Sequence, residues 1–181
     1  MNMLMAGNGG REDPGQREGI YSLIDSLGDQ CEYAERIRAA RALGESRDPR
    51  AISPLVACLK DVDPRVRRCC AEALLGLGSI RSVQAFIERL EDREESVFTR
   101  KVAADALAKI RSYSAVESLA GRLLDPMEKE AIRIHAADAL GRTGSLRAID
   151  ALERGLTDEN PRVKLESEKA LKQIFAFGPS E

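Results

Sequence analysis

The stretch Asp63-Pro64-Arg65-Val66-Arg67-Arg68-Cys69-Cys70-Ala71-Glu72-Ala73-Leu74 decides the fold, because its pattern returns along the chain. Its last residue is one of five leucines separated by 31, 33, 33 and 31 residues: Leu43, Leu74, Leu107, Leu140 and Leu171. Small residues stand just before most of these leucines, as in Ala103-Ala104. A pattern that recurs with this period indicates a stack of helical repeats.

A second set of leucines alternates with the first: Leu27, Leu59, Leu90, Leu123 and Leu156. Each has apolar residues four and seven positions earlier, which places an apolar stripe on one face of a helix. Each repeat therefore holds two helices, and the sequence predicts an all-α fold, an α-solenoid of about five repeats without strands. The expected helices span residues 19–28, 31–44, 49–60, 64–77, 80–91, 96–110, 113–124, 129–142, 146–157 and 161–175.

The organisation along the chain follows from where this pattern begins and ends. Residues 1–18 contain four glycines and no apolar period, so they are expected to form a flexible tail. The repeat domain is expected over 19–177, followed by a short tail, 178–181. The last repeat is expected to be the C-terminal cap, because Ser167-Glu168 replaces the small pair of the other copies.

The composition excludes several classes of function. The net charge is only −2 although 32% of the 181 residues are charged, so no strong field favours nucleic acid or an anionic membrane. The chain has four cysteines and no Cys-x-x-Cys pair, from which no disulfide framework is expected. No apolar run has the length of a membrane span or a signal peptide, and a cytoplasmic location is expected.

Two charged columns accompany the repeats. Aspartates follow the second leucines by two residues, and we expect them to cap the next helices: Asp29, Asp61, Asp92, Asp125 and Asp158. Cations precede the first leucines by seven residues: Arg36, Arg67, Arg100, Arg133 and Lys164. A stripe of cations could bind phosphates, but stacked repeats would bring both columns together, and we interpret them as a structural ladder.

These motifs resemble the short HEAT-like repeats of the phycobilisome-lyase family from about Gly19 to Phe177. The resemblance rests on Asp63-Pro64-Arg65-Val66-Arg67 with its echo Asn160-Pro161-Arg162-Val163-Lys164, and on Ala136-Ala137-Asp138-Ala139-Leu140. It implies that the first helix of each repeat is convex and the second concave, with the concave side binding a partner. The residues expected there for binding are Arg50, Arg81, Gln84, Glu88, Arg89, Glu117, Arg122, Asp150 and Arg154.

The sequence offers no catalytic constellation. His135 is the only histidine and is expected to pack on the convex side. Cys69 and Cys70 point about 100° apart on a helix and cannot easily share one metal ion. Cys70 occupies the small-residue column and is expected to be buried, whereas Cys58 is expected to be the accessible thiol. No catalytic residue, metal or cofactor is predicted.

The mixed charges of the expected concave face suit a protein or peptide better than a nucleic acid backbone. The leading hypothesis is therefore a non-catalytic scaffold that binds a partner protein on this face, with an undetermined oligomeric state. The resemblance leaves two alternatives, a bilin lyase or lyase-chaperone subunit and a HEAT-type nucleic-acid-binding protein.

Overall fold

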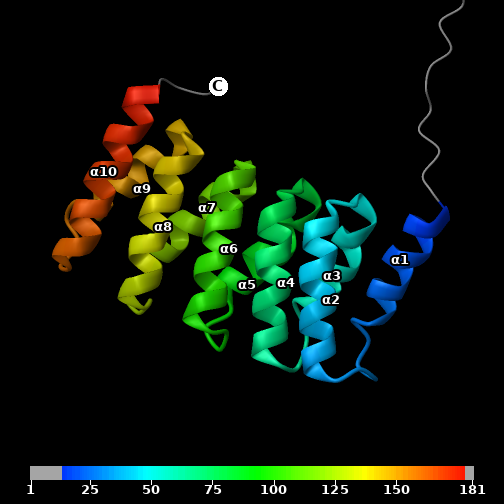
Figure 1. Ribbon diagram of the computed structural model, residues 1–181. Helices are drawn as coiled ribbons and strands as arrows, with labels where there is room; N and C mark the ends of the chain where they lie inside the picture. The colour runs from blue at the N-terminus through cyan, green and yellow to red at the C-terminus, as the bar shows by residue number, and fades with distance from the viewer. Residues whose placement is uncertain (1–13, 178–181) are drawn as a thin grey trace, which may run out of the picture.

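The computed structural model describes residues 14–177, which form a stack of paired helices (Figure 1). The helices are α1 (Pro14–Asp25), α2 (Tyr33–Ser46), α3 (Ile52–Cys58), α4 (Pro64–Leu77), α5 (Val83–Glu91), α6 (Val97–Ile110), α7 (Tyr113–Leu124), α8 (Glu130–Thr143), α9 (Ile149–Gly155) and α10 (Pro161–Phe177). No strand occurs in this described part. The prediction of an all-α solenoid with ten helices is confirmed.

The helix starts differ from the expectation at α1 and at the three helices that follow a 3₁₀ turn. α1 begins at Pro14, so the described end of the expected tail is helical; residues 1–13 and 178–181 lie outside the described residues. Short 3₁₀ turns precede α3, α5 and α9: η1 (Pro49–Ala51), η2 (Ile80–Ser82) and η3 (Leu146–Ala148). The side chains of Asp48 and Ser79 accept hydrogen bonds from backbone N–H groups of the first two turns, which fixes where those turns begin.

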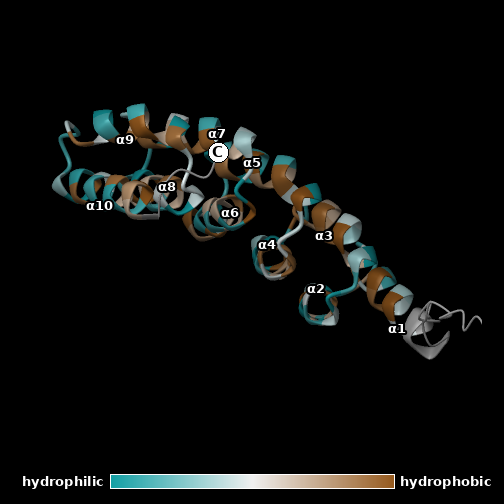
Figure 2. Cartoon of the chain, turned by 90° about the horizontal axis from the view of Figure 1, so that it is seen from above, coloured by the Kyte–Doolittle hydropathy of each residue, from teal (hydrophilic) through white to brown (hydrophobic). Residues whose placement is uncertain are grey.

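The helices form two rows, which are seen from above in Figure 2. The inner row consists of α2, α4, α6, α8 and α10, and the outer row consists of α1, α3, α5, α7 and α9. In this view the stack bends, and the inner row lies on the inside of the bend. The expectation that the second helices of the repeats line the concave side is therefore wrong, because those helices make the outer row.

Close approach within the inner row explains the direction of the bend. A Cβ atom added to Gly44 of α2 would lie 2.7 Å from the Cβ of Ala73 on α4. One added to Gly141 of α8 would lie 2.7 Å from the Cα of Ala170 on α10. Small residues let these inner helices approach closely, and the stack curves toward the inner row.

The two sets of leucines form the core between the rows. Leu43, Leu74, Leu107 and Leu140 are fully buried, as are Leu90 and Leu123 of the second set. Each buried leucine contributes about 1.5–3 kcal/mol. Leu156, which directly follows α9, is 39% exposed because α9 is the last helix of the outer row in the described chain.

Candidate functional site

Ion pairs with little exposure to solvent join the first four inner helices, α2, α4, α6 and α8, each to the loop after the next outer helix. Nε and Nη2 of Arg36 donate to the carboxylate of Asp61 at 2.7 and 2.9 Å, and both side chains are buried. Arg133 forms the corresponding pair with Asp158. At these two positions the predicted ladder of arginine and aspartate columns is confirmed.

In the two middle repeats the partner is a glutamate instead of the column aspartate. Arg67 donates to Glu95 at 2.6 and 3.2 Å. Arg100 donates to Glu128 at 2.9 and 2.5 Å. The reason is loop length: these repeats are 33 residues long rather than 31, and the two extra residues bring a glutamate into the position that an aspartate fills in the shorter repeats.

The surroundings of these glutamates keep them ionised. Burial alone would raise the pKa of Glu128, but hydrogen bonds from Arg100 and the Lys129 backbone, together with the charges of Arg100 and Arg122, bring it below its usual value. Glu95 follows the same pattern, with burial opposed by Arg67 and by the backbone of Ser96, and its pKa is also lowered. Both members of these ion pairs are therefore charged, and the pairs link consecutive repeats.

The column aspartates do not cap the following helices, which corrects a further expectation. Four of the five accept a hydrogen bond from the backbone N–H two residues later, as Asp61 does from Asp63 at 2.8 Å. The caps stand closer to the helices: Asp63 accepts from the N–H of Arg65, and Ser96 from that of Thr99. The aspartates thus shape the loops that also hold the arginines.

This arrangement argues against the phosphate-stripe interpretation of the cation column. Arg36 and Arg100 are buried, and Arg67 is largely covered and paired with Glu95. Lys164 is exposed, since no further repeat follows it in the described chain. The column is structural, and the functional surface has to be sought elsewhere.

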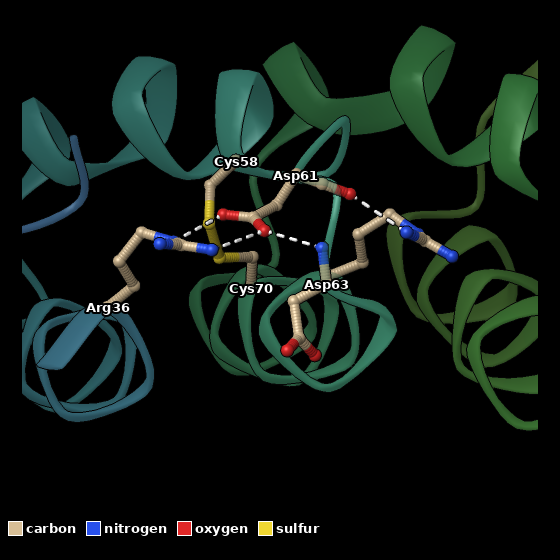
Figure 3. The surroundings of a disulfide bond; sticks show 6 residues. Arg36, Cys58, Asp61, Asp63 and Cys70 are labelled. Atoms are coloured by element: carbon tan, nitrogen blue, oxygen red, sulfur yellow. Dashed lines mark hydrogen bonds and ion pairs between the residues drawn. A yellow bond between two sulfur atoms is a disulfide. The ribbon is translucent and has the colours of Figure 1, made fainter. Parts of the chain in front are cut away.

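A disulfide between Cys58 and Cys70 joins α3 to α4, with Cα atoms 6.1 Å apart. Figure 3 shows it beside the ion pair of Arg36 and Asp61. The expectation of no disulfide is wrong here, because helix pairing brings together two cysteines that show no motif in the sequence. Cys58 is buried rather than accessible, whereas the prediction that Cys70 is buried is confirmed. Cys31 and Cys69 are free.

The residues predicted to bind a partner all lie on the outer row or the 3₁₀ turns that lead into it, and they divide into two groups. Six are exposed: Arg81, Gln84, Glu88, Glu117, Asp150 and Arg154. Three are half-buried and occupied by internal contacts. Arg50 pairs with Asp48, and Arg89 and Arg122 pair with acidic residues of the adjoining loops. A partner surface on the outer row stays a prediction for the exposed six.

Two hollows open on the inner row. The larger, with a volume of about 430 Å³, lies between α2 and α4 over Gly44 and Cys69. The other, which we call the inner-row hollow, has a volume of about 310 Å³ and is lined by Lys101, Glu130, Ala131, Ile134, His135 and Arg162. These side chains belong to three successive inner helices, α6, α8 and α10.

His135 lies in the inner-row hollow and not on a convex side, which corrects the expectation for this residue. Burial lowers the pKa of its imidazole, and the charge of Lys101 lowers it further. Asp105, Asp138 and a hydrogen bond to the backbone of Ala131 oppose this change without cancelling it. The imidazole is therefore largely uncharged at neutral pH.

Arginines stack on exposed aromatic rings along the same row. The guanidinium of Arg65 lies 3.8 Å from the ring centre of Tyr33, and that of Arg68 lies 3.8 Å from the ring centre of Phe98. These rings are 42% and 43% exposed. The sequence pattern did not predict this surface, although Tyr33 and Phe98 fall close to the same position in their repeats.

The described residues contain no cluster of three or more side chains that could hold a metal ion. None of their helices is long and apolar enough to cross a membrane. The inner row carries two hollows and an aromatic and basic surface.

Two rows of paired helices with a 31- to 33-residue repeat define an α-solenoid of the HEAT and armadillo type. The family model for HEAT repeats matches residues 20–100 and 94–172, and the chain belongs to this family. The resemblance noted in the sequence is confirmed.

Comparison with individual proteins narrows this family. The chain is 38% identical over 88 residues to phycocyanobilin lyase subunit alpha of Synechococcus elongatus, an alignment that covers 45% of this chain and 32% of that protein. The match thus spans about a third of the length of this relative. Its fold matches the complex of CpcE and CpcF of phycocyanin lyase from Nostoc, with a TM-score of 0.67, 22% identity, and coverage of 97% of this chain and 70% of that one. It also matches computationally designed armadillo repeat proteins for modular peptide recognition, with a TM-score of 0.59, 19% identity, and coverage of 87% and 83%.

The leading hypothesis of a non-catalytic scaffold is wrong. The curated relative is a lyase subunit, so the comparison favours the alternative that the sequence analysis placed second. Solenoid architecture alone carries no information about activity, so the repeat pattern of the sequence could not distinguish a lyase subunit from a non-catalytic scaffold.

Proposed function

We propose that this chain is a helical module of a bilin lyase, which binds an open-chain tetrapyrrole such as phycocyanobilin and acts together with a second protein. The observation that carries the proposal is the 38% identity to phycocyanobilin lyase subunit alpha over 88 residues. With a repeat of 31 to 33 residues, a stretch of that length spans nearly three repeats of this solenoid.

The character of the inner row supports this function. A bilin is a conjugated, flat molecule with carboxylate side groups, and it needs aromatic or apolar contacts as well as cations. Tyr33 and Phe98 are half-exposed rings, each stacked with an arginine. Aromatic faces beside guanidinium groups suit an anionic conjugated ligand.

The outer row supplies a surface for the second protein, which this proposal assigns to the expected partner-binding residues that are exposed. Arg81, Glu117 and Arg154 come from three successive outer helices or their leading turns and alternate in charge. Mixed charges of this kind give specificity for a complementary protein surface. The partner of a lyase subunit is the natural candidate.

Two measurements test the proposal. Purified chain is mixed with phycocyanobilin, and binding is expected to change the position and intensity of the visible absorption bands of the bilin. The chain is then combined with a partner lyase subunit and apo-phycocyanin, and covalent attachment of the bilin to the apoprotein is followed by zinc-enhanced fluorescence in a denaturing gel. Attachment above the background without the chain is expected.

A matched pair of variants separates the bilin from the partner. Arg81→Glu is expected to weaken capture of the partner subunit while leaving the absorption change with bilin intact. Arg68→Gln is expected to do the reverse, since it removes the cation stacked on Phe98. Unchanged absorption bands together with no attachment in the complete mixture would refute the lyase assignment.

A further inference from the structure

The inner-row hollow differs in charge from the other hollows described here. Lys101 and Arg162 line it as cations, and Glu130 is its single carboxylate. The hollow between α2 and α4 balances Arg41 and Arg47 against two glutamates. A third hollow, on the outer row, holds one lysine, Lys60, and two aspartates. The inner-row hollow alone among these three has an excess of positive charge.

Its cations are only partly satisfied within the described residues. Lys101 makes no hydrogen bond or ion pair there. Arg162 donates to Glu130 at 3.0 Å and still extends into solvent. The half-buried ammonium group of Lys101 therefore has no carboxylate partner there, and it lies next to the uncharged imidazole of His135. Both groups can donate hydrogen bonds to a ligand at the surface of the stack.

The acidic residues nearby are already held by other groups. Asp105 and Asp138, one turn along α6 and α8, both accept from Arg142, at 2.5 and 3.3 Å. On α10, Glu166 pairs with Lys169 at 3.1 Å. These carboxylates therefore do little to neutralise Lys101, and the local field stays favourable for an anion.

A flat surface adjoins the hollow. Phe98 precedes Lys101 by three residues on α6, and residues three apart lie on the same face of a helix. Arg68 covers one side of that ring. Ala131 and Ile134 add small apolar contacts within the hollow itself. Together they make an anion-binding corner next to an aromatic platform.

We propose that the inner-row hollow binds a carboxylate of the bilin, with Lys101 and Arg162 as donors and His135 as a third. This inference rests on the proposed lyase function and assigns it a place on the molecule. The carboxylate group of the ligand accepts hydrogen bonds from Lys101 and from the imidazole, while the conjugated rings extend toward Phe98.

The imidazole provides a direct readout. An incoming carboxylate favours the charged form of His135, so ligand binding raises the pKa of the imidazole, which burial and Lys101 otherwise lower. Because His135 is the only histidine of the chain, its ring signals in an NMR spectrum need no assignment. The bilin therefore binds more tightly as the pH falls toward the pKa of this group.

The experiment titrates the chain with phycocyanobilin and with its dimethyl ester, following bilin absorption and the His135 ring signals against pH. The acid form is expected to raise the His135 pKa, and the ester is expected to bind about tenfold more weakly, the effect of losing one charge-assisted hydrogen bond. Lys101→Gln is expected to weaken binding of the acid form about tenfold and to leave the ester unaffected. Lys60→Gln, on the outer row, is the matched control, and circular dichroism checks that each variant is folded.

The outcomes separate the two proposals. The proposal for the hollow is overturned if the bilin bands change but the ester binds as tightly as the acid. It is also overturned if the bands change while the His135 signals do not respond and Lys101→Gln binds as the wild type does. In both cases the lyase function stands. If the bilin bands do not change at all, the proposal for the hollow is overturned, and the lyase function falls with it when the complete mixture shows no attachment. A hexaglutamate peptide serves as a third ligand, and an equal response of His135 to it would assign the hollow to an acidic peptide and overturn the bilin assignment.

Discussion

Arg100 of α6 and Glu128 of the loop before α8 form a bidentate ion pair in which both side chains are almost fully buried, at 1% and 2% exposure. Arg100 also donates through Nε to the carbonyl of Leu90, at 2.8 Å. One guanidinium thus connects three parts of two successive repeats: an inner helix, the end of α5 and the next loop. In a stack in which each repeat touches only its neighbours, such a link couples the stability of adjacent repeats.

Arg100→Met is expected to lower the free energy of unfolding by about 3–5 kcal/mol, because it leaves the carboxylate of Glu128 buried without a partner. Urea denaturation followed by circular dichroism measures the loss. Lys172→Met is the control, since its pair with Glu168 is exposed to solvent, and no measurable change is expected there. Equal stability of the Arg100→Met variant and the wild type would show that the ladder does not hold the repeats together.

The double variant Arg100→Met with Glu128→Leu should recover much of this loss. Replacing both members of a buried ion pair by apolar groups is often neutral or stabilising, whereas removing one is costly. The measurement is the same denaturation curve. A double variant that is even less stable than Arg100→Met would contradict the view that the unpaired carboxylate causes the loss.

Acid should weaken the stack in two steps whose signs follow from the pKa shifts. The pKa of His135 is lowered below 6.5 by folding, so below that pH the unfolded chain takes up a proton first and stability begins to fall. Glu95 and Glu128 also have lowered pKa values, so their stabilisation is present above 4.5 and is lost as the pH falls through the lowered values. Thermal unfolding against pH measures both steps. His135→Gln should remove the first step only, and Glu128→Gln should reduce the second.

Much of this fold could be predicted from the sequence because every repeat contributes the same evidence. The leucines and small residues recur in five copies, and each copy must bury the same face against its neighbours. Even the choice of ladder partner was available, since 31-residue steps use Asp61 and Asp158 while 33-residue steps use Glu95 and Glu128. The aspartates recur in all five repeats and the glutamates in only two, so the aspartate column is the more conspicuous pattern.

The features that the sequence did not predict depend on how helices meet in space. The direction of the bend depends on which row packs more closely, and this is decided by contacts such as that between Gly44 and Ala73. The inner-row hollow is formed by Lys101, His135 and Arg162 from three helices, and none of these residues alone differs in the sequence from an ordinary surface residue. The disulfide likewise needs α3 and α4 to pair before Cys58 and Cys70 are neighbours.

Reduction of the disulfide between Cys58 and Cys70 should lower stability by roughly 2–3 kcal/mol, the value expected when a cross-link closes a loop of about a dozen residues. The melting temperature with and without dithiothreitol measures the effect. Cys58→Ala should have a similar effect and should abolish the response to dithiothreitol. Cys69→Ala, at the neighbouring free thiol, should retain that response. A wild-type chain that is indifferent to dithiothreitol would mean that the bond contributes nothing.

Ser167 offers a test of how the last repeat departs from the others. It stands in the small-residue column with Ala136 and is fully buried like it, but its hydroxyl has no hydrogen-bond partner. The Oγ atom also lies close to Gly155, where an added Cβ would come within 2.3 Å of it. Ser167→Ala is therefore expected to stabilise the chain by about 1 kcal/mol or more, since a buried donor without a partner costs about 1–3 kcal/mol. The reciprocal change Ala136→Ser should destabilise it by a similar amount, measured by the same urea denaturation. If Ser167→Ala is less stable than the wild type, the hydroxyl has a partner. The polar residue at this position would then stabilise the C-terminal cap instead of lowering its stability.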